Sequence, residues 1–180
     1  MNKYTPKLVV DSVYDIDFVS IYNQGYNVIF FDVDNTLMKY TEKLPSIELI
    51  NLFNELKRIG FSIYLITNNS SKRISLIQEL LIIDGFLSRA NKPKNKKIQN
   101  FASSLNIDLS KTIGIGDQLV TDILSYNRCG IYSIIVKTMD KTVQKWYTKI
   151  NRIREKKIIK NIKIENEIIG KRLEEICQDV

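Results

Sequence analysis

Short apolar runs alternate with amphipathic stretches along most of the chain. The runs expected to form strands cover residues 27–34, 61–67, 112–117 and 131–137. The first is apolar at consecutive positions, as is usual for a strand of a parallel sheet that is buried on both faces. Between the runs, apolar residues recur every three or four positions, which indicates helices that bury one face. The alternation predicts an α/β fold built on a doubly wound parallel sheet.

Turn and cap residues limit the expected helices. The helices are predicted over residues 46–60, 71–85, 93–106 and 119–130. Gly60 and Gly85 provide C-terminal stops, and Pro93 suits a first helical turn because no N–H is needed there. No repeat or low-complexity linker interrupts the pattern. A chain of 180 residues with 44% apolar content therefore predicts one domain with an appendage.

The composition excludes several kinds of chemistry. The chain has no histidine, which rules out a Ser-His-Asp triad, a His-ligated zinc and a phosphohistidine intermediate. Cys129 and Cys177 lie far apart and neither begins a CxxC pair, so a reducing setting is expected. No apolar run is long enough for a signal peptide or approaches the ~20 residues of a membrane span. We therefore expect a cytoplasmic protein.

Polar side chains with catalytic potential follow the ends of the predicted strands and helices. They are Asp32 and Asp34, Thr67 and Asn68, Lys92, and Asp117 followed by Asp122. Open α/β sheets bind ligands in the crevice beyond the carboxyl ends of their strands. Taken singly, each residue also suits a structural role as a loop cap, a strand end, a solvated charge or a helix N-cap. Their joint placement favours a site.

The acids indicate phosphoryl transfer assisted by Mg²⁺. Crowded carboxylates repel one another unless a cation lies between them, and oxygen ligands without histidine favour Mg²⁺. In an extended segment, Asp32 and Asp34 would point to the same side, within reach of one phosphoryl group. One acid could attack phosphorus while the other protonates the leaving alkoxide. Lys92, Thr67 and backbone N–H groups would hold the phosphoryl oxygens.

Four short motifs together resemble those of the haloacid dehalogenase (HAD) phosphatase superfamily. They are DVDNT at 32–36, ITNN at 66–69, the lysine of NKP at 92 and GDQLVTD at 116–122. The wider context, over residues 6–160, resembles the YqeG-type branch, subclass IIIA. The resemblance implies a HAD-like, Rossmann-like sheet and a phosphoric monoester hydrolase.

The resemblance also implies a role for each residue. Asp32 would be the nucleophile and a metal ligand, and Asp34 the general acid/base whose backbone carbonyl also binds Mg²⁺. Asp117 would be a further metal ligand. The remaining assignments are phosphate binding by Thr67, Asn68 and Lys92, and supporting roles for Thr36 and Asp122. Lys94, Lys96 and Lys97 are the alternatives to Lys92 in RANKPKNKK.

Short connections predict a catalytic domain without a cap. Only 30 residues separate Thr36 from Thr67, and 24 separate Thr67 from Lys92. Each connection is used by one helix and its flanks, whereas HAD enzymes that act on small metabolites usually carry an inserted cap. An open site cannot enclose a small molecule. We therefore expect a phosphate carried by something large: a lipid, a nucleic-acid end or another protein.

Positive charge is concentrated in the last quarter of the chain. The net charge is +7, and residues 137–163 contain ten Lys or Arg and two acids. An apolar stripe at helical spacing consists of Val143, Trp146, Tyr147, Ile150 and Ile153. A lysine stripe on another face consists of Lys141, Lys145 and Lys149. Such a helix could lie on an anionic membrane, or it could pack on the core with its lysines in solvent. Nucleic acid is a third option, which a basic patch alone supports poorly.

These observations predict a capless HAD-like domain over residues 1–137 and a basic helical extension over 138–180. The expected function is a Mg²⁺-dependent phosphatase that forms an aspartyl-phosphate. Eukaryotic relatives of the YqeG-type branch are similar to phosphatidylglycerophosphate phosphatases, which makes a phospholipid the leading substrate and peripheral contact with the inner membrane face an expectation. The alternatives are a nucleotide or nucleic-acid-end phosphatase, and a non-enzymatic module that binds the ribosome or RNA. Oligomeric state and the role of residues 164–180 stay open.

Overall fold

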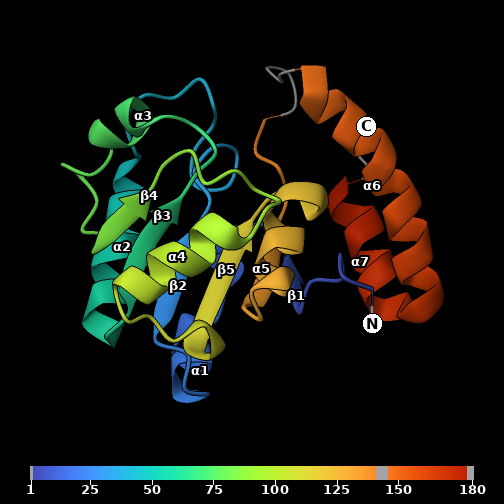
Figure 1. Cartoon of the computed structure of the whole chain (residues 1–180), viewed down its shortest axis with the longest axis horizontal. Helices are drawn as coiled ribbons and strands as arrows, with labels where there is room; N and C mark the ends of the chain where they lie inside the picture. The colour runs from blue at the N-terminus through green and yellow to red at the C-terminus, as the bar shows by residue number, and fades with distance from the viewer. Residues whose placement is uncertain (1, 141–145, 178–180) are drawn as a thin grey trace.

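The chain is built around one parallel sheet of six strands (Figure 1). The computed structural model describes residues 2–140 and 146–177, and side chains in all of these except 146–153. The strands are β1 (Leu8–Val10), β2 (Val28–Phe31), β3 (Ser62–Ile66), β4 (Gly85–Leu87), β5 (Thr112–Gly116) and β6 (Tyr132–Val136). They lie in the order β1-β6-β5-β2-β3-β4, and all neighbours are parallel. The predicted α/β fold with a doubly wound parallel sheet is confirmed.

Helices lie on both faces of the sheet. The α-helices are α1 (Phe18–Asn23), α2 (Ile47–Ile59), α3 (Ser71–Ser75), α4 (Lys96–Ser104), α5 (Leu124–Arg128), α6 (Trp146–Glu165) and α7 (Glu167–Cys177). Three short helical turns complete the set: η1 (Val13–Asp15), η2 (Leu109–Lys111) and the π-helical η3 (Leu119–Ile123). No helix in the described ranges is long and apolar enough to cross a membrane.

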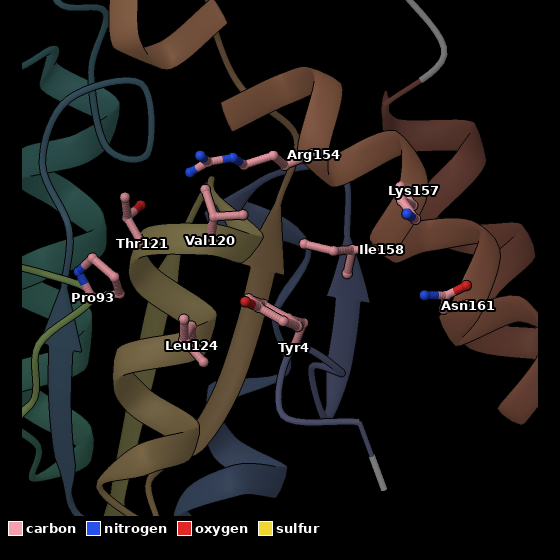
Figure 2. A pocket seen from close by; sticks show the side chains of 9 residues that line it. All are labelled: Tyr4, Pro93, Val120, Thr121, Leu124, Arg154, Lys157, Ile158 and Asn161. Atoms are coloured by element: carbon pink, nitrogen blue, oxygen red, sulfur yellow. The ribbon is translucent and has the colours of Figure 1, made fainter. Parts of the chain in front are cut away.

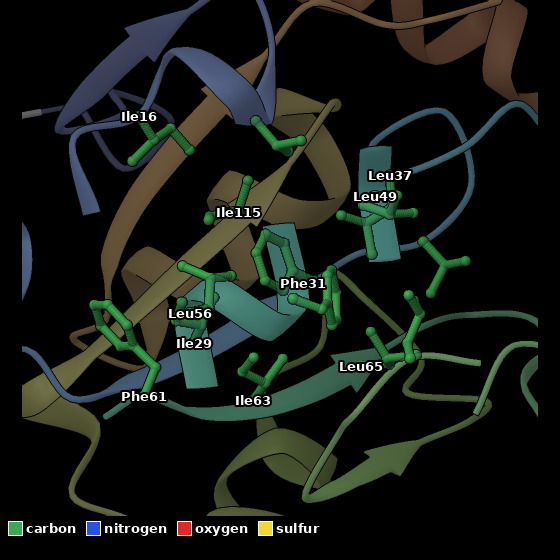
Figure 3. Close-up of a cluster of buried hydrophobic side chains, with 14 of the residues drawn as sticks. Ile16, Ile29, Phe31, Leu37, Leu49, Leu56, Phe61, Ile63, Leu65 and Ile115 are labelled. Atoms are coloured by element: carbon green, nitrogen blue, oxygen red, sulfur yellow. The ribbon is translucent and has the colours of Figure 1, made fainter. Parts of the chain in front are cut away.

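The central strand β2 contributes side chains to the hydrophobic cores on both faces of the sheet. Ile29 and Phe31 point to one face of the sheet, where α1 and α2 cover them (Figure 3). Val28 and Phe30 point to the opposite face, under α4 and α5. Successive side chains of a strand alternate between faces, so a run of four apolar residues is buried only where both faces are covered. The apolar run ends with β2 at Phe31, and Asp32 follows directly at the carboxyl end of the strand.

The last two helices form a hairpin against the β1 side of the sheet. Ile135 of β6, Ile162 of α6 and Leu173 of α7 are buried in one cluster with the apolar side chains of η3. Gly170 makes the close approach possible, because a Cβ there would collide with the backbone of Lys163. The predicted apolar and lysine stripes between 141 and 153 lie outside the residues whose side chains are described. The division at residue 137 stays a prediction.

Two predicted helix limits are wrong, and two short strands were not predicted. The helix predicted over 71–85 ends as α3 at Ser75, and Gly85 begins β4 instead. Asp84 explains the change of direction, because its carboxylate accepts the Ile63 N–H at 2.7 Å and aligns the chain beside β3. The next helix begins at Lys96 rather than at Pro93, after a turn in which the residue 94 N–H donates to the residue 91 carbonyl. Strand β1, only three residues long, was not predicted.

Candidate active site

The residues predicted to be catalytic meet at the carboxyl ends of adjacent strands. Asp32 and Asp34 follow β2, Thr67 follows β3, Lys92 follows β4 and Asp117 follows β5. The order β5-β2-β3-β4 makes these four strand ends neighbours. The sheet therefore brings together segments that are far apart in sequence.

Lys92 is a buried cation held between two carboxylates. Its side chain is only 2% exposed, and Nζ lies 2.7 Å from Asp32 Oδ1 and 2.6 Å from Asp122 Oδ1. Nζ also donates to the Ile66 carbonyl at 2.8 Å, so all three ammonium protons have an acceptor. Burial would lower the pKa of Lys92, but the carboxylates of Asp122 and Asp32 raise that pKa well above its ordinary value. The lysine is therefore charged.

The neighbouring asparagine fixes the position of this lysine. The side-chain amide of Asn68 donates to the Lys92 carbonyl at 3.0 Å and accepts the Lys92 N–H at 2.7 Å. Asn68, predicted to bind phosphate, thus has its amide engaged with the backbone that carries Lys92. Thr67 is buried at the end of β3, and its Oγ1 accepts the Asn69 N–H at 3.1 Å. The alternative lysines Lys94, Lys96 and Lys97 are exposed.

Three buried carboxylates form a compact acidic cluster. Oxygens of Asp32, Asp117 and Asp122 lie within 4.8 Å of one another, and Thr36 Oγ1 donates to Asp32 Oδ2 at 3.1 Å. Burial raises the pKa of Asp32 to about 7, against the effect of Lys92 and with that of Asp122. Burial, then Asp122 and Asp32, raise the pKa of Asp117 well above its ordinary value. Lys92 therefore supplies one positive charge against three carboxylates.

Asp117 carries the clearest indication that the cluster can bind a cation. Its Oδ1 is fully buried and accepts no hydrogen bond from any described residue. Buried polar atoms are nearly always paired, so an unpaired carboxylate oxygen needs a partner of another kind. Hard oxygen donors clustered in this way suit a divalent cation such as Mg²⁺.

Two glycines of β5 explain how Asp122 reaches the cluster. A Cβ at Gly116 would collide with the side chain of Asp122, and one at Gly114 would lie 2.5 Å from the ring of Tyr126. Both glycines face the same side of the strand, so η3 and α5 can lie directly on it. The glycines of the TIGIG sequence therefore leave space for the Asp122 carboxylate of the following helical turn to contact Lys92.

The second predicted catalytic acid has a different environment. Asp34 is outside the acidic cluster, and its carboxylate accepts from Asn69 Nδ2 at 2.5 Å and pairs with Arg73 Nε at 3.0 Å. Arg73 also donates to the backbone carbonyls of Lys39 and Glu42, which ties the loop after β2 to α3. The chain is not extended beyond Asp34, since Asn35 has φ of 66°. Asp32 and Asp34 therefore have separate partners.

Three residues to which the sequence analysis gave no role also belong to this region. Arg73 and Asn69 hold Asp34, as described above, and Glu155 reaches the catalytic loop from α6. Glu155 Oε1 accepts the N–H groups of Leu119 and Val120 at 2.7 and 3.3 Å, at the start of η3. Helical N–H groups in a first turn lack intrahelical partners, so this carboxylate caps them. Nothing in the basic run around Glu155 distinguishes it from an ordinary surface acid.

Comparison with known proteins agrees with the predicted resemblance. The family model described as HAD-hydrolase-like matches residues 89–163. A Bacillus subtilis protein named probable phosphatase YqeG is 28% identical over 165 residues, which cover 92% of this chain and 95% of that protein.

Solved structures share the fold at low sequence identity. One is the cobalt-bound deoxy-D-mannose-octulosonate 8-phosphate phosphatase of Haemophilus influenzae, with TM-score 0.53, 14% identity, and 71% of this chain and 75% of that chain covered. Another is the D,D-heptose 1,7-bisphosphate phosphatase of B. bronchiseptica, complexed with magnesium and phosphate, with TM-score 0.50, 16% identity, and 62% and 81% covered. The predicted resemblance to the HAD superfamily is confirmed.

Proposed function

Because residues 89–163 match the HAD-hydrolase-like family model, we propose that the chain is a Mg²⁺-dependent phosphatase that acts through an aspartyl-phosphate. The observation that carries the proposal is the buried ion pair of Lys92 with Asp32, beside Asp117 and Asp122. The ion pair positions the Asp32 carboxylate at the end of a central strand, where a nucleophile is needed. The predicted assignment to HAD-type phosphatases agrees with the relatives described above.

The residues of the acidic cluster fit a bound Mg²⁺. Asp32 and Asp117 would hold it with their carboxylates and Asp34 with its backbone carbonyl, while Asp122 would support the site. The unpaired Oδ1 of Asp117 supports this assignment. When bound, Mg²⁺ would neutralise charge on the carboxylates and on the phosphate oxygens.

The chain's own residues then divide the reaction into two displacements. Asp32 attacks phosphorus, a bond from its carboxylate to phosphorus forms, the bond to the leaving oxygen breaks, and Asp34 protonates that oxygen. In the second step Asp34 takes a proton from water, the water oxygen bonds to phosphorus, and the bond to Asp32 breaks to release phosphate. Lys92 and Thr67 would hold the phosphoryl oxygens throughout. Arg73 keeps Asp34 in position.

For the substrate we propose a phospholipid such as phosphatidylglycerophosphate, reached at an anionic membrane through residues 137–163. The short connections around the site leave no room for an inserted cap, and the described part of α6 exposes four cations: Arg154, Lys156, Lys157 and Lys160. Each basic residue near an anionic surface contributes about 1 kcal/mol of attraction. Within this proposal, the chemistry belongs to residues 1–137 and the membrane contact to the basic segment 137–163.

Turnover of a substrate panel tests the proposal. We expect Mg²⁺-dependent release of phosphate from vesicle-borne phosphatidylglycerophosphate, with much less from nucleotides and from a 3′-phosphorylated oligonucleotide. Asp32→Asn should abolish all turnover. Preferred turnover of the oligonucleotide would replace the lipid assignment, and undiminished activity in EDTA would contradict the Mg²⁺ assignment.

A charge reversal on the basic segment tests the membrane contact. Changing Lys141, Lys145 and Lys149 together to Glu should reduce cosedimentation with anionic vesicles and leave hydrolysis of a soluble aryl phosphate nearly unchanged. High salt should have the same effect on the wild type, because exposed charges are screened beyond ~8 Å at physiological ionic strength. Equal sedimentation of both proteins at low salt would show that the segment does not bind the membrane.

A further inference from the structure

A groove lies between η3 and α6, beside the catalytic loops (Figure 2). Its volume is about 430 Å³, which falls within the range of small-molecule sites. Much of the lining is apolar, and Tyr4, Val120, Leu124 and Ile158 contribute to it. The groove is thus a partly apolar surface formed by four segments that are distant in sequence.

Two cations of α6 stand on one side of this groove. Arg154 and Lys157 are spaced three residues apart, which places them on the same face of the helix. Both are exposed, and neither forms an ion pair with another residue in the described ranges. Figure 2 shows the guanidinium of Arg154 extending above Val120 toward the side of Thr121. Because the residues that line the groove include no acid, its charge is suited to an anion.

The groove adjoins the phosphate site through two of its residues. Pro93 directly follows Lys92, and Thr121 directly precedes Asp122. Thr121 Oγ1 lies 3.4 Å from Asp122 Oδ2, and Asp122 in turn pairs with Lys92. A ligand in the groove would therefore lie one residue away from the groups that face the reacting phosphate. Such a ligand could be the remainder of the same substrate molecule.

We propose that this groove binds the leaving-group side of the substrate: a phosphodiester held by Arg154 and Lys157, with the adjoining apolar chain against Tyr4 and Ile158. The proposal rests on the proposed phosphatase function and identifies where the second phosphate and the apolar portion of such a substrate bind. A phosphodiester shares one negative charge over two non-bridging oxygens. Arg154 and Lys157 can each donate a hydrogen bond to one of these oxygens. A volume of about 430 Å³ accepts the head of such a molecule and leaves long chains outside.

A pair of charge-matched double variants tests this subsite. Arg154→Ala with Lys157→Ala removes the two groove cations, and Lys156→Ala with Lys160→Ala removes two exposed cations of the same helix that do not line the groove. Both variants lose the same charge, so non-specific attraction falls equally. Melting curves of all three proteins establish that they are folded.

The substrates separate the groove from the reaction centre. With soluble dihexanoyl phosphatidylglycerophosphate below its micelle concentration, the groove variant should raise KM by about tenfold or more, while the matched control stays near the wild type. With p-nitrophenyl phosphate, which has no second phosphate, all three proteins should agree within about twofold. Removing both acyl chains from the lipid should raise KM for the wild type as well.

Binding without turnover distinguishes failure of this inference from failure of the proposed function. Titration of dihexanoyl phosphatidylglycerol, which has the diester but no phosphomonoester, should bind the wild type and the control and lose affinity for the groove variant. A wild type that hydrolyses p-nitrophenyl phosphate with Mg²⁺, together with equal lipid kinetics and binding in both double variants, would overturn the subsite. An inactive wild type that still binds the diester through Arg154 and Lys157 would instead overturn the phosphatase function and keep the groove as a phosphodiester site.

Discussion

The acidic cluster predicts that metal-free protein loses stability as the pH rises from 5 to 8. Burial raises the pKa of Asp32 from an ordinary value of 3.8 to about 7 in the folded state. Between these two values the folded state binds more protons than the unfolded state, so the free energy of unfolding falls with increasing pH. The stabilising contribution is thus fully present near pH 4 and is lost as the pH passes through about 7.

The size of the loss follows from the pKa difference. Each unit corresponds to ~1.4 kcal/mol, so the two units between pH 5 and the pKa of about 7 amount to ~3 kcal/mol. The raised pKa of Asp117 acts in the same direction. For a chain of this length ~1 kcal/mol changes the melting temperature by ~2–4 °C, which gives a decrease of ~6–12 °C. The chain contains no histidine, so ordinary side chains add little to the pH dependence in this window.

Mg²⁺ should offset this pH dependence of the stability. It binds the ionised carboxylates, and protons compete with it at low pH. Stabilisation by millimolar Mg²⁺ is therefore expected to be larger at pH 8 than at pH 5, so the melting temperature should become nearly independent of pH.

Thermal melting monitored by circular dichroism, in EDTA or in Mg²⁺ at pH 5, 6, 7 and 8, measures both effects. Asp32→Asn serves as the control, because it removes the titrating carboxyl and should flatten the metal-free curve. The reasoning is refuted if wild type and Asp32→Asn have the same pH slope in EDTA. An equal Mg²⁺ effect at pH 5 and pH 8 would refute it as well.

Three substitutions test individual residues of the site. Asp34→Asn should reduce activity on an alkyl phosphate far more than on an aryl phosphate, whose phenolate leaves without a proton; equal losses would contradict the assignment of the general acid. Lys92→Met should destabilise the metal-free protein by about 3–5 kcal/mol in urea unfolding, because it leaves buried carboxylates without their cation, while Lys94→Met should have no effect. Glu155→Ala should lower the free energy of unfolding by about 1–3 kcal/mol and should lower kcat by loosening the loop after Asp117. Glu155→Gln keeps an acceptor and should retain most of the stability and of kcat. Identical behaviour of the two variants would show that the cap at η3 does not cause these losses.

Local patterns in the sequence were enough to predict the four longer strands of the sheet and the edge at which the acidic residues lie. A run of four apolar residues marks β2 as a strand covered on both faces, and the acids after it mark the edge where ligands bind. Burial is thus recorded within a few residues of each element.

Other features depend on partners that are distant in sequence, and local patterns could not reveal them. The apolar run after α3 is compatible with a helix, and only the contact of Asp84 with β3 makes residue 85 the start of a strand. Arg73 looks like a solvated charge until Asp34 is seen beside it. Glu155 likewise caps η3 only because α6 packs against η3 in the folded chain. The groove has the same origin, since its walls come from opposite ends of the chain.

The position of β1 sets the order in which a newly made chain can finish folding. This strand pairs only with β6, and the partners Leu8 and Ile134 are 126 positions apart. At about 5–20 residues per second of synthesis, the N-terminal strand waits roughly 6–25 s for the segment it pairs with. Glu155, which caps the loop after Asp117, is made later still. A chain whose synthesis stops before residue 155 therefore contains Asp32 and Asp117 but lacks the carboxylate that caps the loop after Asp117.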